Sequence, residues 1–258
     1  MKSTVAGLAG GTARQPVANC YHASRDQQTE PAPVELPETI EVASGEEPRG
    51  SVIWLHGLGA DGHDFEPIVG ELALGERLDL RFVFPHAPLR PVTINGGMTM
   101  RAWYDVLTLD RGGPQDEAGI RQSSEMLKGL VEREIERGIE SENIVLAGFS
   151  QGGAIAQHTA LRYPRDLAGL MALSSWLPLE NSFDEEVAGN ASAQSRALEI
   201  FMAHGSFDPM LPIALGQHSR EVLQKAGYSV EWHEYPMAHA VCGEEIVDIR
   251  NWLLKVFE

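Results

Sequence analysis

The chain has 258 residues, enough to bury one sizeable core, and α/β proteins of this length are commonly single domains. Hydrophobic residues make up 43% and charged residues 22%, which indicates a globular rather than a fibrous or disordered protein. The formal net charge of -17 repels phosphate backbones and anionic lipid surfaces, so the composition argues against nucleic acid and favours neutral or zwitterionic small molecules as partners.

The first 32 residues show no apolar periodicity and lead into the segment TEPAP, so we expect a flexible N-terminal extension before a folded domain over residues 33–258. The apolar run at the start is too short for a signal-peptide core, and no run approaches the ~18 residues of a membrane span. Cys20 and Cys242 lack metal-ligand spacing and are expected to be free thiols in a reducing compartment. The sequence therefore predicts a cytoplasmic protein without stable membrane insertion.

Short apolar runs, typical of strands buried on both faces, alternate with segments of helical spacing. After a short edge strand over residues 34–42, strands are predicted at SVIWLHG, LRFVFPHAP, NIVLAGFS, GLMALSSWLP, LEIFMAHG and YSVEWHEYPM. Helical spacing is found over residues 120–135, 154–161, 222–226 and 246–257. This alternation predicts an α/β fold with a mostly parallel central sheet and helices on both faces. Ligands of such a sheet collect outside the carboxyl ends of its strands.

One pentapeptide at such a strand end, GFSQG at residues 148–152, carries a serine between two glycines. Its position between a predicted strand and a predicted helix is typical of a nucleophile elbow. The elbow strains the backbone of its serine, and glycines two residues away keep Cβ atoms out of the turn. In the alternative interpretation Ser150 only caps the following helix. The flanking elements favour Ser150 as the nucleophile.

A serine nucleophile needs an imidazole base, and the imidazole needs a carboxylate that fixes its tautomer. His239 lies in the loop after the last predicted strand, and Asp208 lies just beyond the end of the strand before it. The alternatives are a solvated surface histidine and an Asp-Pro turn. The order serine, aspartate, histidine is that of the triads of this fold, so we predict that Ser150, Asp208 and His239 are catalytic.

Acyl transfer also requires N–H donors for an oxyanion. The backbone N–H of Gln151 is available at the start of the predicted helix. A second donor is expected in the glycine-flanked turn LHGLG after an earlier central strand, where the backbone N–H of Leu58 is the candidate.

Seven ordered motifs run from about residue 36 to the C-terminus: LHGLGADGHDF, FVFPHAP, RPVTINGGMTMRAWYD, GFSQGGA, LSSWLP, HGSFDP and YPMAHAV. With them the chain resembles the carboxylesterase and acyl-protein thioesterase family, also called the phospholipase/carboxylesterase family, of α/β-hydrolases. The run NGGMTMRAWYD is similar to the bacterial esterase branch. The resemblance implies an α/β-hydrolase catalytic domain with the same triad and oxyanion donors.

The resemblance further implies that a flap over residues 89–113 covers an acyl groove, with Trp103 and Trp176 near the substrate. It implies no metal or cofactor, and it leaves a homodimer open. From these features we expect a carboxylesterase for esters of short to medium acyl chain, with acyl-protein thioesterase or lysophospholipase activity as the alternative. A dienelactone hydrolase would carry cysteine in place of Ser150, and a catalytically silent binding protein would not need an ordered triad.

Overall fold

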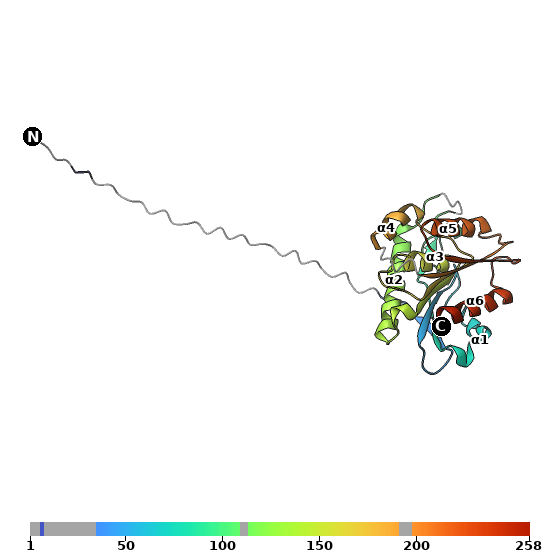
Figure 1. The fold of residues 1–258 in the computed structure, drawn as a ribbon. Helices are drawn as coiled ribbons and strands as arrows, with labels where there is room; N and C mark the ends of the chain where they lie inside the picture. The colour runs from blue at the N-terminus through green and yellow to red at the C-terminus, as the bar shows by residue number, and fades with distance from the viewer. Residues whose placement is uncertain (1–5, 8–34, 109–112, 191–197) are drawn as a thin grey trace, which may run out of the picture. The chain divides into compact units, whose positions relative to one another are not determined.

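The structure, a computed structural model, describes residues 6–7, 35–108, 113–190 and 198–258 (Figure 1). Val34–Glu258 is one compact unit. The extension predicted over residues 1–32 and Cys20 within it lie outside the described part, apart from residues 6–7.

Within the described residues, seven strands form one sheet in the order β1-β3-β2-β6-β7-β8-β9. The β1 strand pairs antiparallel with β3 at one edge, and every other neighbouring pair in this sheet is parallel. The strands are β1 (Thr39–Ala43), β2 (Gly50–Leu55), β3 (Leu80–Pro85), β6 (Ile144–Phe149), β7 (Gly169–Leu173), β8 (Glu199–Gly205) and β9 (Val230–Tyr235). The predicted, mostly parallel sheet is confirmed, and the predicted edge strand is β1.

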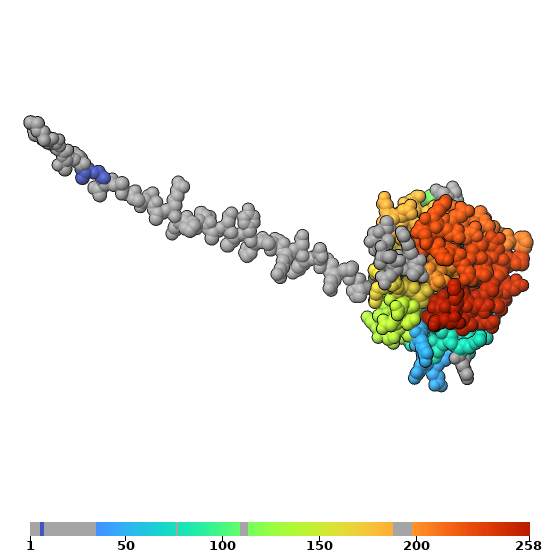
Figure 2. Space-filling model, in the orientation of Figure 1, coloured from blue at the N-terminus to red at the C-terminus, as the bar shows by residue number. Residues whose placement is uncertain are grey.

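Helices cover both faces of this sheet (Figure 1). One face carries α2 (Glu117–Glu136), α3 (Gln151–Ala160) and α5 (Ile213–Lys225), and the other carries α1 (Ile68–Leu72) and α6 (Gly243–Val256). In the space-filling view, the atoms of α1 lie against those of α6, which ends the chain (Figure 2). The four predicted helical segments correspond to α2, α3, α5 and α6.

The central strands are buried on both faces because their side chains alternate between two apolar layers. All six residues of β2 are buried. Val52 and Trp54 pack toward α1 and α6, whereas Ile53 and Leu55 pack toward α2 and α3. Such a strand reads as a continuous apolar run, which is the pattern that predicted it. Because β2, β6 and β8 run parallel, the loops that follow them lie at the same edge of the sheet.

Two strands and two α-helices of the described residues were not predicted from the sequence. A hairpin of β4 (Leu89–Val92) and β5 (Met98–Arg101) lies in the segment expected to form a flap, and α1 and α4 (Phe183–Asn190) are short helices. The five residues of α1 are too few to show helical periodicity. In β4, Pro91 argues against a strand. Among the helices of the described ranges, none is long and apolar enough to cross a membrane.

Candidate active site

Ser150 occupies a strained turn between β6 and α3. Its backbone angles are φ 54 and ψ -118, outside the regions that side chains ordinarily allow, at a cost of ~1–3 kcal/mol. Two hydrogen bonds hold the turn: Ser150 N donates to Leu173 O at 2.9 Å, and Ser175 Oγ donates to Ser150 O at 2.7 Å. The packing around it therefore imposes the conformation of a nucleophile elbow.

The glycines of the motif GFSQGG are required by close backbone contacts. A Cβ atom on Gly152 would lie 2.6 Å from His56 O, and one on Gly153 would lie 2.7 Å from Ser175 Cβ. Gly148 is equally confined, since a Cβ atom there would lie 2.5 Å from Gly153 N. Because these positions have no Cβ atoms, α3 packs closely against β2 and β7, and its first turn lies at the carboxyl end of the sheet.

Asp208 and His239 come together at the ends of β8 and β9. His239 Nδ1 donates to Asp208 Oδ2 at 2.6 Å, so its Nε2 atom is the proton acceptor of the neutral ring. The other oxygen of Asp208 accepts from Met210 N and Leu211 N, each at 2.8 Å. The Asp208 side chain is fully buried and that of His239 is 18% exposed. The carboxylate is therefore fixed, and the imidazole faces the open side of the site.

His204, on β8 just before the Asp208 loop, is a polar residue that the sequence did not single out. It is buried on β8, its Nε2 donates to Leu211 O at 2.8 Å, and this nitrogen lies 3.6 Å from Asp208 Oδ2. Burial lowers its pKa, which favours the neutral ring, and the bond to Leu211 O holds the turn that presents Asp208. The sequence signal for His204 is a histidine within the apolar run LEIFMAHG, which was predicted to be a strand.

The two halves of the site meet at Phe149. The Phe149 ring centroid lies 4.7 Å from that of His239, and Phe149 directly precedes Ser150. On the other side, a Cβ atom on Gly57 would lie 3.3 Å from Phe149 Cδ1 and 3.5 Å from Ser150 Cβ. The turn after β2, which carries Leu58, therefore adjoins the serine, and His239 packs against Phe149 with its ring tilted by 46°.

The turn after β2 is fixed by the side chain of His56. His56 Nε2 accepts from Ala87 N at 3.0 Å, and its Nδ1 donates to Gly57 O at 2.7 Å. Burial lowers its pKa to about 4, so the ring is neutral at physiological pH and keeps both bonds. Gly59 N donates to Arg101 O at 2.9 Å, which ties the turn to β5. The half-buried Leu58 lies between these anchors.

The Gln151 side chain is buried and binds a neighbouring segment with both ends of its amide. Its Oε1 accepts from Trp103 N and its Nε2 donates to Tyr104 O, each at 2.8 Å. The predicted role of Gln151 concerned only its backbone N–H at the start of α3, and its side chain is an additional feature of the site.

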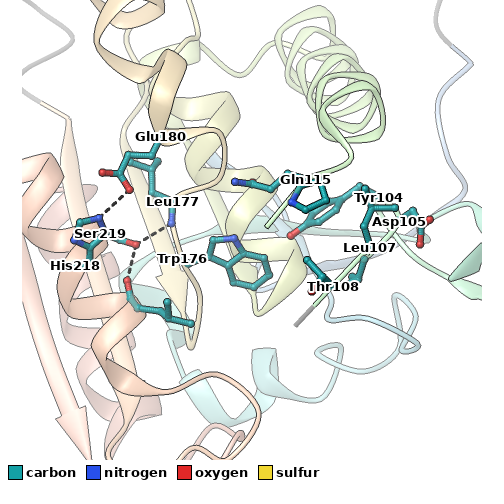
Figure 3. A pocket seen from close by; sticks show the side chains of 13 residues that line it. Tyr104, Asp105, Leu107, Thr108, Gln115, Trp176, Leu177, Glu180, His218 and Ser219 are labelled. Carbon is teal, nitrogen blue, oxygen red and sulfur yellow. Dashed lines mark hydrogen bonds and ion pairs between the residues drawn. The ribbon is translucent and has the colours of Figure 1, made fainter. Parts of the chain in front are cut away.

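A cavity of about 200 Å³ begins beside this segment. Trp176 lies at its centre, between Tyr104 and Thr108 on one side and Leu177 on the other (Figure 3). The Trp176 and Tyr104 ring centroids are 6.4 Å apart, edge to face. At one end, the exposed side chains of Glu180 and His218 are hydrogen-bonded, with 2.8 Å between carboxylate and imidazole. Trp176 directly follows Ser175, whose hydroxyl binds Ser150 O, so one wall of the cavity belongs to a segment that contacts the elbow.

The two tryptophans expected near the substrate differ in exposure. Trp176 is half-buried and lines the cavity, whereas Trp103 is 1% exposed and packs in the core beneath it. Of the flap expected over residues 89–113, the structure describes the β4–β5 hairpin and the segment to Thr108, which lines the cavity. Residues 109–112 lie outside the described part of the chain.

The model of the phospholipase/carboxylesterase family matches residues 37–257. The chain belongs to this family. Acyl-protein thioesterase 1 of Neurospora crassa is 40% identical over 212 residues, covering 80% of this chain and 86% of its own. Acyl-protein thioesterase 1 of Mycosarcoma maydis is 39% identical over 232 residues, covering 84% and 95%. The crystal structure of Arabidopsis thaliana SOBER1 superimposes with a TM-score of 0.75 at 31% identity, covering 81% of this chain and 100% of its own.

Membership of this hydrolase family, together with the sheet topology, confirms the predicted α/β-hydrolase fold. Across the residues that the structure describes, no group of three His, Cys, Asp or Glu side chains is arranged as a metal site.

Proposed function

We propose that this family member is a serine hydrolase that cleaves carboxylic esters of short to medium acyl chain through an acyl-enzyme on Ser150. The observation that carries the proposal is the 2.6 Å bond between His239 and Asp208, with the imidazole packed against Phe149 beside a strained serine. A serine that served only as a helix cap would not need this strain, and it makes no side-chain cap bond to α3.

In the acylation step, Ser150 Oγ attacks the carbonyl carbon of the substrate while its proton passes to His239 Nε2. Asp208 stabilises the imidazolium through its bond to Nδ1. The carbonyl oxygen becomes an oxyanion, which the backbone N–H groups of Leu58 and Gln151 receive, each worth roughly two to three powers of ten in rate. As the tetrahedral intermediate collapses, His239 returns the proton to the leaving alkoxide and the acyl-enzyme remains.

Deacylation repeats these steps with water as the nucleophile. His239 takes a proton from the water, the hydroxide attacks the acyl carbon, and the proton then returns to Ser150 Oγ as the carboxylic acid leaves. All the groups used are side chains and backbone N–H groups of this chain.

The acyl group is assigned to the cavity beside Trp176. Tyr104, Trp176 and Leu177 give the cavity aromatic and aliphatic walls, and one end carries the hydrogen-bonded pair of Glu180 and His218. Burial of an apolar chain against the aromatic and aliphatic walls is favourable. At the Glu180–His218 end, the terminal carbons of a long chain would displace water from polar groups, which is unfavourable. A cavity of about 200 Å³ with this polarity favours acyl groups of short to medium length.

Thioester hydrolysis is the second candidate, and the names of the Neurospora and Mycosarcoma relatives favour it. The same triad and oxyanion donors would serve a thiolate leaving group, which needs less help from a proton donor than an alkoxide. Lysophospholipids present the same acyl ester with a zwitterionic head, which is compatible with a surface of net charge -17.

The test is to measure hydrolysis of p-nitrophenyl esters from acetate to palmitate, of an S-acylated peptide, and of lysophosphatidylcholine. The Ser150→Ala variant and a fluorophosphonate label identify the nucleophile. We expect turnover of the shorter esters, label on Ser150, and loss of both in the variant. Wild-type protein that hydrolyses none of the three substrate classes and takes no label would refute the proposal.

A further inference from the structure

Trp103 joins the two sides of the oxyanion hole by hydrogen bonds. Its indole Nε1 donates to His56 O at 2.9 Å, and its backbone N donates to Gln151 Oε1 at 2.8 Å. His56 directly precedes the turn that carries Leu58 N–H, and Gln151 carries the other predicted donor on its own backbone. One residue therefore bridges both segments whose N–H groups would receive the oxyanion.

Two further hydrogen bonds hold the segment of Trp103 in place. Ser123 Oγ on α2 donates to Trp103 O, and Gln151 Nε2 donates to Tyr104 O at 2.8 Å. The indole is 1% exposed and lies 5.3 Å, centroid to centroid, from the His56 ring. With no open face, the Trp103 side chain does not line the cavity that Tyr104 and Trp176 line.

Buried hydrogen bonds at both ends make such a bridge stiff. Without its indole donor, His56 O is left as an unpaired acceptor in a dry environment, which costs ~1–3 kcal/mol and drives the peptide to move. The peptide that would move begins the turn of Leu58. An oxyanion hole works because its donors are fixed before the charge develops, and a displacement of about 1 Å costs about a hundredfold in rate.

We propose that Trp103 is a positioning residue for the oxyanion hole: its indole N–H and its backbone N–H set the spacing between the turn of Leu58 and the first turn of α3. The inference rests on the proposed function and changes the role of Trp103 from a substrate contact to a support for two backbone donors. Since the neighbouring Tyr104 lines the cavity, the same segment links the acyl site to the oxyanion hole.

A positioning role and a substrate contact predict different kinetics. Misplaced donors weaken binding of the tetrahedral oxyanion and leave ground-state binding unchanged, so kcat falls and KM stays. Loss of a substrate contact raises KM. The Trp103→Phe variant removes the indole donor and keeps an aromatic ring in the core, and we expect kcat to fall 10- to 100-fold with KM within about twofold of wild type.

The test measures kcat and KM on the best p-nitrophenyl ester, together with inhibition by a trifluoromethyl ketone of the same acyl length. The ketone forms a tetrahedral oxyanion on the serine, so its affinity should weaken in Trp103→Phe by about the factor lost from kcat. The matched control is Trp176→Phe, which alters a cavity wall: its main effect should be on KM, with ketone binding weakened no more than substrate binding.

Trp103→Phe with wild-type kcat and wild-type ketone affinity overturns the inference, as does a rise in KM alone. Inactive wild-type protein would overturn the proposed function instead, so the two failures are distinct. If Trp103→Phe does not fold, Gln151→Met tests the other end of the bridge: it removes the side-chain bonds to Trp103 and Tyr104 but keeps the Gln151 backbone N–H. The same loss of kcat and of ketone affinity is then expected, and unchanged values overturn the inference.

Discussion

His239 and Asp208 are separated by 31 positions in the sequence and joined by a hydrogen bond of 2.6 Å in the structure. The bond spans the loops after β8 and β9, which are neighbouring parallel strands. The second oxygen of Asp208 is held by two backbone N–H groups, so the carboxylate cannot turn away from the imidazole.

Replacement of Asp208 by asparagine is expected to lower kcat by about 10⁴-fold, because the amide can donate to Nδ1 and so favours the wrong tautomer of His239. The carbonyl oxygen of asparagine can still accept from Met210 N and Leu211 N, so the fold should be retained. Steady-state kinetics and a thermal unfolding scan measure the two effects. Asp166→Asn, at an acid outside the site, is the control, and a loss below tenfold in Asp208→Asn would assign the carboxylate role elsewhere.

Gly152→Ala is expected to abolish the folded elbow. The new Cβ atom would lie 2.6 Å from His56 O, a backbone atom that the network around Trp103 holds in place, so we expect a cost of ~3 kcal/mol or more. Urea unfolding monitored by circular dichroism measures it. Gly70→Ala on α1 is the matched control, since nothing lies within 4 Å of its new Cβ atom, and it should stabilise the protein by ~0.5–1 kcal/mol. Equal effects at the two glycines would contradict the assigned contacts.

The sequence predicted most of the sheet, because strands such as β2 and β6 are buried on both faces and appear as uninterrupted apolar runs. It also placed Ser150, Asp208 and His239 at the ends of strands that the structure brings to one edge. Their catalytic roles stay predictions, although Asp208 and His239 are in contact.

Tertiary packing determines what the sequence left open. In the sequence, His56 and His204 resemble any other histidine; in the structure, burial lowers the pKa of each and each has a backbone hydrogen-bond partner. The family resemblance implied that Trp103 and Trp176 both lie near the substrate, yet Trp103 is in the core and Trp176 lines a cavity. No local pattern distinguishes these cases, because the direction of a side chain in a loop depends on contacts distant in sequence.

Trp176→Ala is expected to shift the acyl-chain preference toward longer esters. Removal of the indole enlarges a cavity of about 200 Å³ at its centre, so longer chains gain apolar contact while short chains lose it (Figure 3). One altered pocket contact is worth ~1–3 kcal/mol, so the ratio of kcat/KM for octanoate over butyrate should rise by about tenfold or more. Leu36→Ala, at an exposed residue outside the cavity, is the control. An unchanged ratio would show that the acyl chain does not bind in this cavity.

His158→Gln is expected to reduce the loss of stability in acid. Burial holds the pKa of His158 at about 3, with the Arg162 guanidinium adding to the shift, against an ordinary value of 6.5. Between these values the unfolded chain binds the proton and the folded protein does not, so stability falls as pH drops below about 6.5 and is unaffected above it. The variant should retain about 2 kcal/mol more of its pH 7 stability at pH 5 than wild type, by urea unfolding.

The control for this measurement is His218→Gln, an exposed histidine on α5. This variant removes an exposed imidazole rather than a buried one, so we expect a smaller change in the pH dependence of stability than for His158→Gln. If His158→Gln follows wild type, the buried imidazole is not the source of the acid sensitivity.

The last prediction concerns Glu245, which is fully buried in the first turn of α6, just after the loop of His239. Neither carboxyl oxygen makes a well-aligned hydrogen bond among the residues that the structure describes. Burial raises its pKa to about 8, and the Asp248 carboxylate adds to the rise, while the Cys242 backbone N–H opposes it. At neutral pH the folded protein therefore holds a proton on Glu245 that the unfolded chain releases.

For a carboxyl whose folded pKa is raised from 4.5 to about 8, the folded state binds more protons throughout that interval, so stability falls as pH rises from 4.5 to 8 and the loss is complete above 8. Glu245→Gln keeps the shape of the protonated carboxyl and cannot ionise. Its advantage over wild type in unfolding free energy should therefore widen by about 3 kcal/mol between pH 5 and pH 8, measured by urea unfolding.

Glu244→Gln is the matched control, because Glu244 is the exposed neighbour in the same helical turn. Its carboxylate is hydrated and close to the positive end of α6, so its loss should cost ~0.3–1 kcal/mol with little change between pH 5 and pH 8. A gap between Glu245→Gln and wild type that stays constant over this range would show that Glu245 is ionised in the folded protein. It would then need a cationic or hydrogen-bonding partner at the base of the His239 loop, since an unpaired buried carboxylate is far too costly to retain.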